Sequence, residues 1–148
     1  MIKKILKALK QFEGNVVTYS RAGGGAGSIL LIKSQNNISL WIWCYWEISH
    51  YDDLLATADD DTTAIVGKIA VATRQLEGKV IKWIKIDPDY YHLRLGFDDN
   101  YELFVGCESQ PPEEEEFPLD NWELYNQNTK INYVVGCDFS IREEIDSD

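Results

Sequence analysis

Apolar residues near the start of the chain recur at the spacing of one helix face. They are Ile2, Ile5, Leu6, Leu9 and Phe12, and four lysines stand between them. A period near 3.6 residues predicts an amphipathic helix over residues 2–12. Gly14 follows at a place where glycine commonly ends a helix, so we expect the helix to stop there.

A second helix is predicted from Thr62 to Leu76. Its apolar face would carry Ile65, Ile69, Ala72 and Leu76, and Gly78 would close it. Asp59–Asp61 precede it and are typical of an N-terminal cap. The β-branched residues between Thr62 and Val71 could also form a strand, so both alternatives stay open.

Polar turns divide much of the remaining chain into short apolar runs that are typical of antiparallel strands. Asn and Asp tolerate the left-handed backbone of tight hairpins, so Gln35–Asn37 and Asp98–Asn100 are predicted turns. The predicted strands are Val16–Ser20, Ile29–Lys33, Ile38–Trp46, Val80–Ile86, His92–Phe97, Tyr101–Cys107, Trp122–Tyr125 and Ile131–Phe139. An acidic insertion with two consecutive prolines covers 108–121, and an acidic tail covers 141–148.

The chain repeats itself. Gln11–Val17 returns as Gln75–Ile81, and Asn37, Leu40 and Cys44 return as Asn100, Leu103 and Cys107. We therefore predict an α+β fold: two tandem helix–β-meander repeats, approximately 1–58 and 62–140, forming one antiparallel-sheet domain covered by two helices. The sheet would be continuous or would divide into two sheets face to face. Gly14 should superpose on Gly78 and Cys44 on Cys107, with both thiols in the core.

Size and charge narrow the classes of function. A chain of 148 residues can form one domain, 1–148, and its net charge of −11 argues against binding nucleic acid or an anionic membrane. The first residues lack a secretory signal, and the apolar run Leu40–Trp46 is too short to span a bilayer. Three cysteines without metal-type spacing indicate reduced thiols and a cytoplasmic protein.

Residues that could carry chemistry have structural explanations. Gly23–Gly27 lacks the Gly-Lys-Ser/Thr ending of a phosphate loop, and Asp59–Asp61 lacks the central glycine and terminal glutamate of a calcium loop. His50 and His92 have no clustered partner in the sequence. We therefore expect no catalytic residues, no metal, no cofactor and no enzymatic activity.

Two features remain as candidates for binding. Alternation along Ile38–Trp46 places Trp41, Trp43 and Tyr45 on one face, either in an inter-sheet core or at an interface with a partner. Residues 98–148 hold fifteen Asp/Glu and two Lys/Arg, which would solubilise the protein or attract a cationic partner. The acidic candidates are Asp98, Asp99, Glu108, Glu113, Glu114, Glu115, Glu116 and Asp120.

The pattern resembles that of small cytoplasmic immunity proteins of bacterial polymorphic toxin and contact-dependent growth inhibition systems. It consists of a helix ending in Leu/Phe-x-Gly-x-x-Val, an aliphatic strand, an Asn/Asp turn, a further strand and Trp-Glu-Ile/Leu, as at Trp46–Ile48 and Trp122–Leu124. The resemblance implies an inhibitor that binds a cognate toxin domain, often a basic nuclease. Two alternatives are a small-molecule-binding module or enzyme with a pocket between the repeats near Tyr51, Asp52, Tyr90 and Tyr91, and a homo-oligomerising structural domain.

Overall fold

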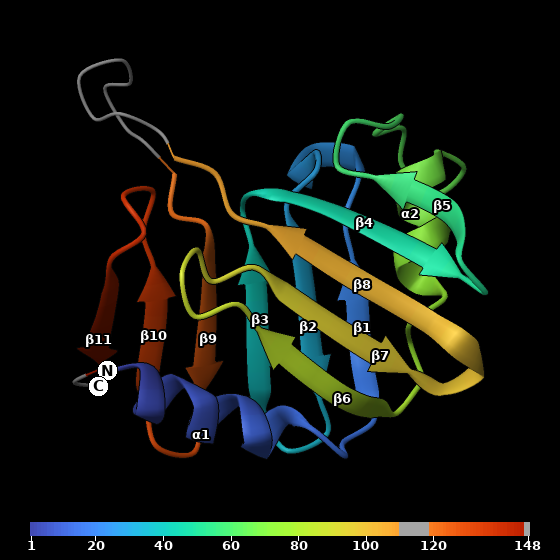
Figure 1. The fold of residues 1–148 in the computed structure, drawn as a ribbon. Helices are drawn as coiled ribbons and strands as arrows, with labels where there is room; N and C mark the ends of the chain where they lie inside the picture. The colour runs from blue at the N-terminus through green and yellow to red at the C-terminus, as the bar shows by residue number, and fades with distance from the viewer. Residues whose placement is uncertain (110–118, 147–148) are drawn as a thin grey trace.

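The protein is α+β, with two antiparallel sheets and two helices, in a computed structural model that describes residues 1–109 and 119–146. The six-stranded sheet has the order β1 (Val17–Arg21), β2 (Leu30–Ser34), β3 (Ile38–Ile42), β9 (Trp122–Asn126), β10 (Ile131–Val135) and β11 (Ile141–Ile145). The five-stranded sheet has the order β5 (Asp53–Thr57), β4 (Tyr45–His50), β8 (Tyr101–Gly106), β7 (Leu93–Phe97) and β6 (Ile81–Ile86). Figure 1 shows both sheets.

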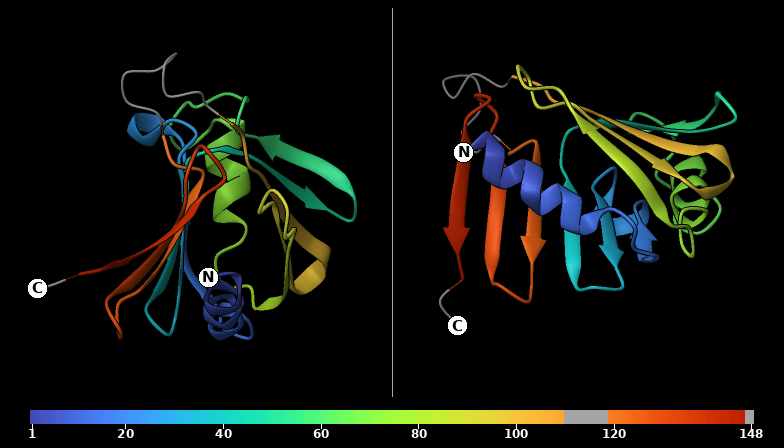
Figure 2. Two further views of the ribbon diagram at one scale, coloured as in Figure 1. Left: turned by 60° about the vertical axis from the view of Figure 1, so that its left-hand side comes forward. Right: turned by 60° about the horizontal axis from the view of Figure 1, so that its bottom comes forward.

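The two sheets face each other, and the helices α1 (Ile2–Phe12) and α2 (Lys68–Arg74) lie between them where the sheets diverge (Figure 2). Alternate residues of the strands point inward, such as Leu30 and Ile32 of β2, and join the apolar faces of both helices in one core. Of the two predicted sheet arrangements, the structure has the face-to-face one. Within the described residues, neither helix is long and apolar enough to cross a membrane.

The predicted single strand Ile38–Trp46 is wrong, because the chain changes sheets within it. β3 ends at Ile42 in the six-stranded sheet, and β4 begins at Tyr45 in the five-stranded sheet. At the crossover, the backbone N–H groups of Trp43 and Cys44 donate to the carbonyl of Asn121 at 2.9 and 3.2 Å. These bonds replace ladder bonds that the crossing residues would otherwise lose.

The second half of the chain makes the matching crossover, from β8 in the five-stranded sheet to β9 in the six-stranded sheet (Figure 1). As a result, β3 pairs with β9 and β4 pairs with β8. The strands that follow the first predicted meander, β4 and β5, therefore join the five-stranded sheet, and those that follow the second, β9 to β11, join the six-stranded sheet. Neither predicted repeat forms a self-contained unit.

Each helix is joined to the next strand by a glycine, and the two junctions make equivalent hydrogen bonds to each other. Gly14 N–H donates to the Ile81 carbonyl at 2.7 Å, and Gly78 N–H donates to the Val17 carbonyl at 2.8 Å. Both glycines have left-handed backbones, with φ of 81° and 83°. Only glycine adopts this region freely, which explains why it follows each helix.

The second helix is shorter than predicted. α2 begins at Lys68 after Gly67, and no aspartate side chain caps it; only the backbone carbonyl of Asp61 accepts from Ile69 N–H in the first turn, at 3.4 Å. The Asp60 carboxylate accepts from Thr57 N–H, and the Asp61 carboxylate accepts from Thr63. The loop before the helix folds tightly, since a Cβ on Gly67 would lie 2.4 Å from the Thr63 carbonyl oxygen.

Two strands appear where none was predicted. β5 follows the turn at Tyr51–Asp52, and β11 occupies most of the predicted acidic tail 141–148. Successive side chains of β11 point to opposite faces of the sheet. Glu143 points toward α1, where its carboxylate forms an ion pair with Lys4 at 3.1 Å, and Arg142 and Glu144 point outward. The acidic residues thus form one edge of a sheet.

Candidate functional site

One cross-strand row runs across the outer face of the six-stranded sheet. Its members are Arg21, Leu31, Trp41, Glu123, Val134 and Arg142, each opposite the next. Directly opposed residues of an antiparallel pair share a face, so these side chains lie side by side. The inward residues next to them, including Ile32, Leu40 and Leu124, are buried in the core.

Trp41 and Trp43 form a stacked pair on this outer face. Their ring centroids are 5.8 Å apart with an interplanar angle of 15°. The Trp41 side chain is 36% exposed, and the Trp43 indole N–H donates to the Glu123 carboxylate at 2.8 Å. The inter-sheet core interpretation is therefore wrong for these two residues, because the core residues of β3 are Ile38, Leu40 and Ile42.

Tyr45, the third aromatic candidate, belongs to the other sheet. It lies at the start of β4, where its ring is beside Gly106 and its hydroxyl donates to Glu47 at 2.8 Å. Burial raises the pKa of Tyr45, and so do the hydrogen bond to Glu47 and the negative charge of the Glu47 carboxylate. The crossover at Trp43–Cys44 therefore separates Tyr45 from the tryptophan pair.

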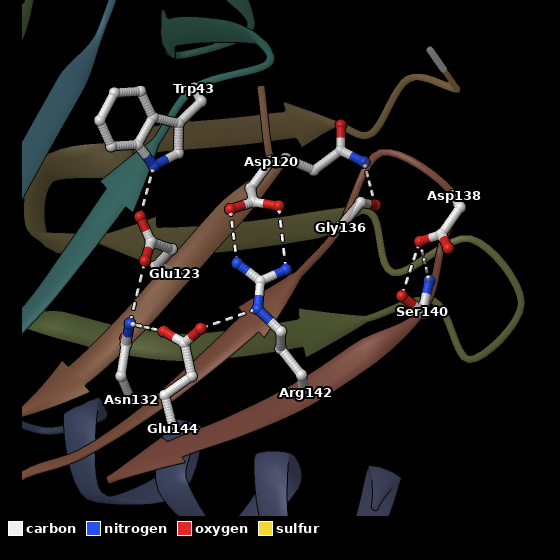
Figure 3. A network of polar contacts seen from close by, with 10 residues as sticks. Trp43, Asp120, Glu123, Asn132, Gly136, Asp138, Ser140, Arg142 and Glu144 are labelled. Atoms are coloured by element: carbon white, nitrogen blue, oxygen red, sulfur yellow. Dashed lines mark hydrogen bonds and ion pairs between the residues drawn. The ribbon is translucent and has the colours of Figure 1, made fainter. Parts of the chain in front are cut away.

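A polar network extends from Trp43 to the edge strand β11 (Figure 3). Asn132 Nδ2 donates to Glu123 Oε1 at 2.9 Å and to Glu144 Oε1 at 3.5 Å. The Arg142 guanidinium contacts Glu144 at 2.8 Å and makes a bidentate pair with Asp120, with N–O distances of 3.1 and 2.9 Å. We call Asp120, Glu123, Asn132, Arg142 and Glu144 the acidic network.

The acidic network carries three carboxylates and one guanidinium, so it keeps a negative charge. Hydrogen bonds to Asp120 and Glu144 raise the pKa of Arg142, which is charged at every physiological pH. The Arg142 side chain remains 47% exposed, so solvent screens these pairs and their effect on stability is small. Their main consequence is geometric, because the bidentate pair fixes the position of the Asp120 carboxylate.

Asn121 holds the two ends of the acidic insertion together. Its Oδ1 accepts from Glu108 N–H at 2.7 Å, and its Nδ2 donates to the Glu108 and Gly136 carbonyls at 3.1 and 2.9 Å. Glu108 and Asp120 are therefore adjacent to the same buried residue. Glu113, Glu114, Glu115 and Glu116 lie outside the described residues.

Asp98 and Asp99 lie at the opposite end of β8 from Glu108 (Figure 1). The Asp98 carboxylate accepts from Val80 N–H at 2.9 Å, and Asp99 pairs with Lys79 at 3.2 Å. A strand rises about 3.3 Å per residue, so β8 separates the two groups by roughly 20 Å. The structure does not bring Asp98 and Asp99 together with Glu108 and Asp120.

Both histidines and two of the three cysteines, Cys44 and Cys107, are engaged in the fold. His50 stacks on Tyr101 with centroids 4.0 Å apart, and His92 Nδ1 accepts from Cys107 N–H at 2.9 Å. A hydrogen bond to Cys107 and burial both raise the pKa of the Cys44 thiol, which disfavours the reactive thiolate. The described residues contain no group of three His, Cys, Asp or Glu side chains that could hold a metal ion.

The structure does not bring the four residues of the suggested pocket together. Tyr51 and Asp52 line a pocket of about 210 Å³ with Trp83 and Glu102 of the second predicted repeat, but Tyr90 and Tyr91 do not line it. Tyr51 and Asp52 turn between β4 and β5 beside Asn100, whose carbonyl accepts from Tyr51 N–H at 3.0 Å. Tyr90 packs on Phe139, and the Tyr91 carbonyl accepts from the Trp122 indole at 2.9 Å. The Tyr51–Asp52 turn and the Tyr90–Tyr91 pair therefore lie at opposite ends of the five-stranded sheet.

Comparison with known proteins finds no matching family model, no matching curated protein and no matching solved structure. The function of the chain is therefore inferred from its own residues.

Proposed function

We propose that the protein is a cytoplasmic bacterial immunity protein that binds and neutralises a basic toxin domain through the outer face of its six-stranded sheet. The observation that carries this proposal is the stacked Trp41–Trp43 pair beside the acidic network. Exposed tryptophans are frequent anchors of protein interfaces, and surrounding carboxylates select a cationic partner. The net charge of −11 would also draw such a partner toward the protein.

The geometry favours binding over catalysis. The tryptophans are held in place before any partner arrives, by their mutual stacking and by the bond from Trp43 to Glu123. Glu123 is held in turn by Asn132, so little side-chain freedom remains to be lost on binding. Preorganisation of this kind lowers the entropic cost of association. An Arg or Lys of the toxin could then contact an indole face and a carboxylate together.

The test is binding of the purified protein to the basic C-terminal domain of a toxin encoded beside its gene. We expect Trp41→Ala and Trp43→Ala each to cost about 2 kcal/mol of binding free energy, or roughly thirtyfold, mainly as faster dissociation. Trp83→Ala is the matched control, because Trp83 lies in β6 of the other sheet. Surface plasmon resonance and protection of cells that express the toxin are the measurements.

Wild-type dissociation rates and full protection in both tryptophan variants would contradict the proposal. A concentration-dependent dimer of the protein alone, lost in Trp41→Ala, would instead assign this face to self-association. Analytical ultracentrifugation of the free protein distinguishes the two cases.

We further infer that the two halves of the chain are tandem copies of one helix–β-meander unit whose later strands are exchanged between sheets. The paired bonds of Gly14 and Gly78 support this, as do the equivalent bonds from Val17 N–H to Lys79 and from Ile81 N–H to Asn15, at 2.8 and 2.9 Å. The two proposed binding features belong to different parts of the chain: the tryptophan pair lies in the first copy, and the acidic network lies in the second copy and the strand that follows it. Position 41 is Trp, whereas its equivalent in the second copy, Phe104, lies on the other sheet.

A further inference from the structure

A second feature of the same outer face is a mostly apolar pocket of about 370 Å³ beside Trp41. Its walls come from β1, β2, β3, α2 and the loop before α2. The residues that matter most are Tyr19, Leu31, Trp41, Ile65, Arg21 and Arg74. Pockets of this size, apolar with a few convergent polar groups, are typical of ligand sites.

The loop that forms one wall is held in an unfavourable conformation. Ile65 has φ of 69°, a left-handed backbone that a β-branched residue rarely adopts, and its side chain is 70% exposed. The Arg74 guanidinium keeps it there by donating to the Ile65 carbonyl, while Arg74 Nε donates to the Ala70 carbonyl at 3.1 Å. Backbone strain of this kind is often retained where it shapes a binding site.

The charge around this pocket is opposite to that of the protein as a whole. Among the described residues, its lining has two arginines and no carboxylate. Arg21 pairs with Glu77 at 3.1 Å, whereas no described carboxylate lies within ion-pair distance of Arg74. Lys33 adds a further cation, since its Nζ lies 5.5 Å from the centre of the Tyr19 ring.

We propose that this pocket binds a peptide segment of a partner protein in which a large apolar side chain stands directly beside a carboxylate. The apolar side chain would enter between Leu31, Trp41 and Ile65, and the carboxylate would meet Arg74 and Lys33 at the rim. Charge complementarity selects this occupant, because a neutral or basic segment would leave the two cations unpaired. The site does not require the partner to be a toxin.

N-acetyl-phenylalanine is a suitable probe, and N-acetyl-phenylalaninamide is its neutral match. We expect the acid to bind with a dissociation constant on the order of 1 mM and at least threefold more tightly than the amide at low salt. In ¹H–¹⁵N NMR spectra recorded during titration with the acid, the largest chemical-shift changes should occur at the Trp41 indole and the backbone amides of residues 64–74. Acetate alone should produce no comparable shifts, because it lacks the apolar group.

Two variants separate charge from structure. Arg74→Gln and Lys33→Gln should each reduce the preference for the acid over the amide, and Lys33→Gln does so without touching the bonds that hold Ile65. Arg94→Gln, on the other sheet, should leave the preference unchanged. Equal binding of acid and amide, equal shifts with acetate, or no binding at all would each overturn the proposal. None of these outcomes bears on the tryptophan test of toxin binding.

Discussion

Asn121 is the buried polar residue on which the crossover depends. It is 2% exposed, and every polar group it carries has a partner. Its backbone carbonyl accepts from Trp43 and Cys44, and its N–H donates to Val135 at 2.8 Å. Its position as the last residue of the acidic insertion 108–121, just before Trp122, gave no sign of this role, because an Asn in such a context is usually a turn residue.

Replacing Asn121 with Ala should lower the free energy of unfolding by about 3 kcal/mol. The change removes three side-chain hydrogen bonds and leaves Glu108 N–H and the Gly136 carbonyl without this partner. Urea denaturation followed by tryptophan fluorescence measures the effect. Asn128→Ala is the control, since that exposed side chain makes one bond, to the Asn36 carbonyl at 2.8 Å. A loss in Asn121→Ala no larger than in Asn128→Ala would contradict the assigned role.

Each helix in this fold is followed by a glycine turn that directs the chain into an edge strand of a sheet, β1 or β6. Gly14 and Gly78 have nearly equal φ angles and open space where a Cβ would stand. An alanine at either place would therefore meet no steric obstacle from neighbouring residues. Only its own left-handed backbone would be unfavourable.

Gly14→Ala and Gly78→Ala should each destabilise the fold by about 1–2 kcal/mol, and by equal amounts within error. Gly25→Ala, in an open site without positive φ, should change stability by less than about 0.5 kcal/mol. Thermal and urea unfolding of the three variants measures this. A large difference between the Gly14 and Gly78 variants would show that the two junctions are not energetically equivalent.

Hydrophobic alternation predicts most strands and their inner faces, because burial in a sandwich repeats every two residues. It predicted β2, β6 and β7 within a residue or so of their observed bounds. It missed the crossover at Trp43–Cys44, since the alternation continues through both sheets without a break. It also misplaced the start of α2, where tertiary contacts around Gly67 override a sequence that suits a helix. The candidate tryptophans came from the pattern, but Asn121, Asn132 and Arg142 did not.

Across the whole molecule, charge is divided between the two ends of one sheet face. Arg21, Lys33 and Arg74 lie near β1 and β2, and the acidic network lies on β9, β10 and β11 with Asp120 just before β9. Trp41 and Trp43 stand between the two groups. A partner that uses the full face would be basic at one end and apolar with a carboxylate at the other, which is a more selective pattern than net charge alone.

Removing the two carboxylates that hold Arg142 should slow association with a basic toxin. The double variant Asp120→Asn/Glu144→Gln removes the net negative charge of the acidic network and leaves Arg142 without its ion-pair partners. At low salt we expect the association rate to fall roughly fivefold, with a weaker dependence on ionic strength, because steering acts before contact. Asp52→Asn/Asp53→Asn makes the same change in net charge at the exposed β4–β5 turn and should alter the rate much less. Stopped-flow mixing at two salt concentrations compares the two variants. Equal slowing in both would mean that the net charge of the protein, and not the acidic network, attracts the toxin.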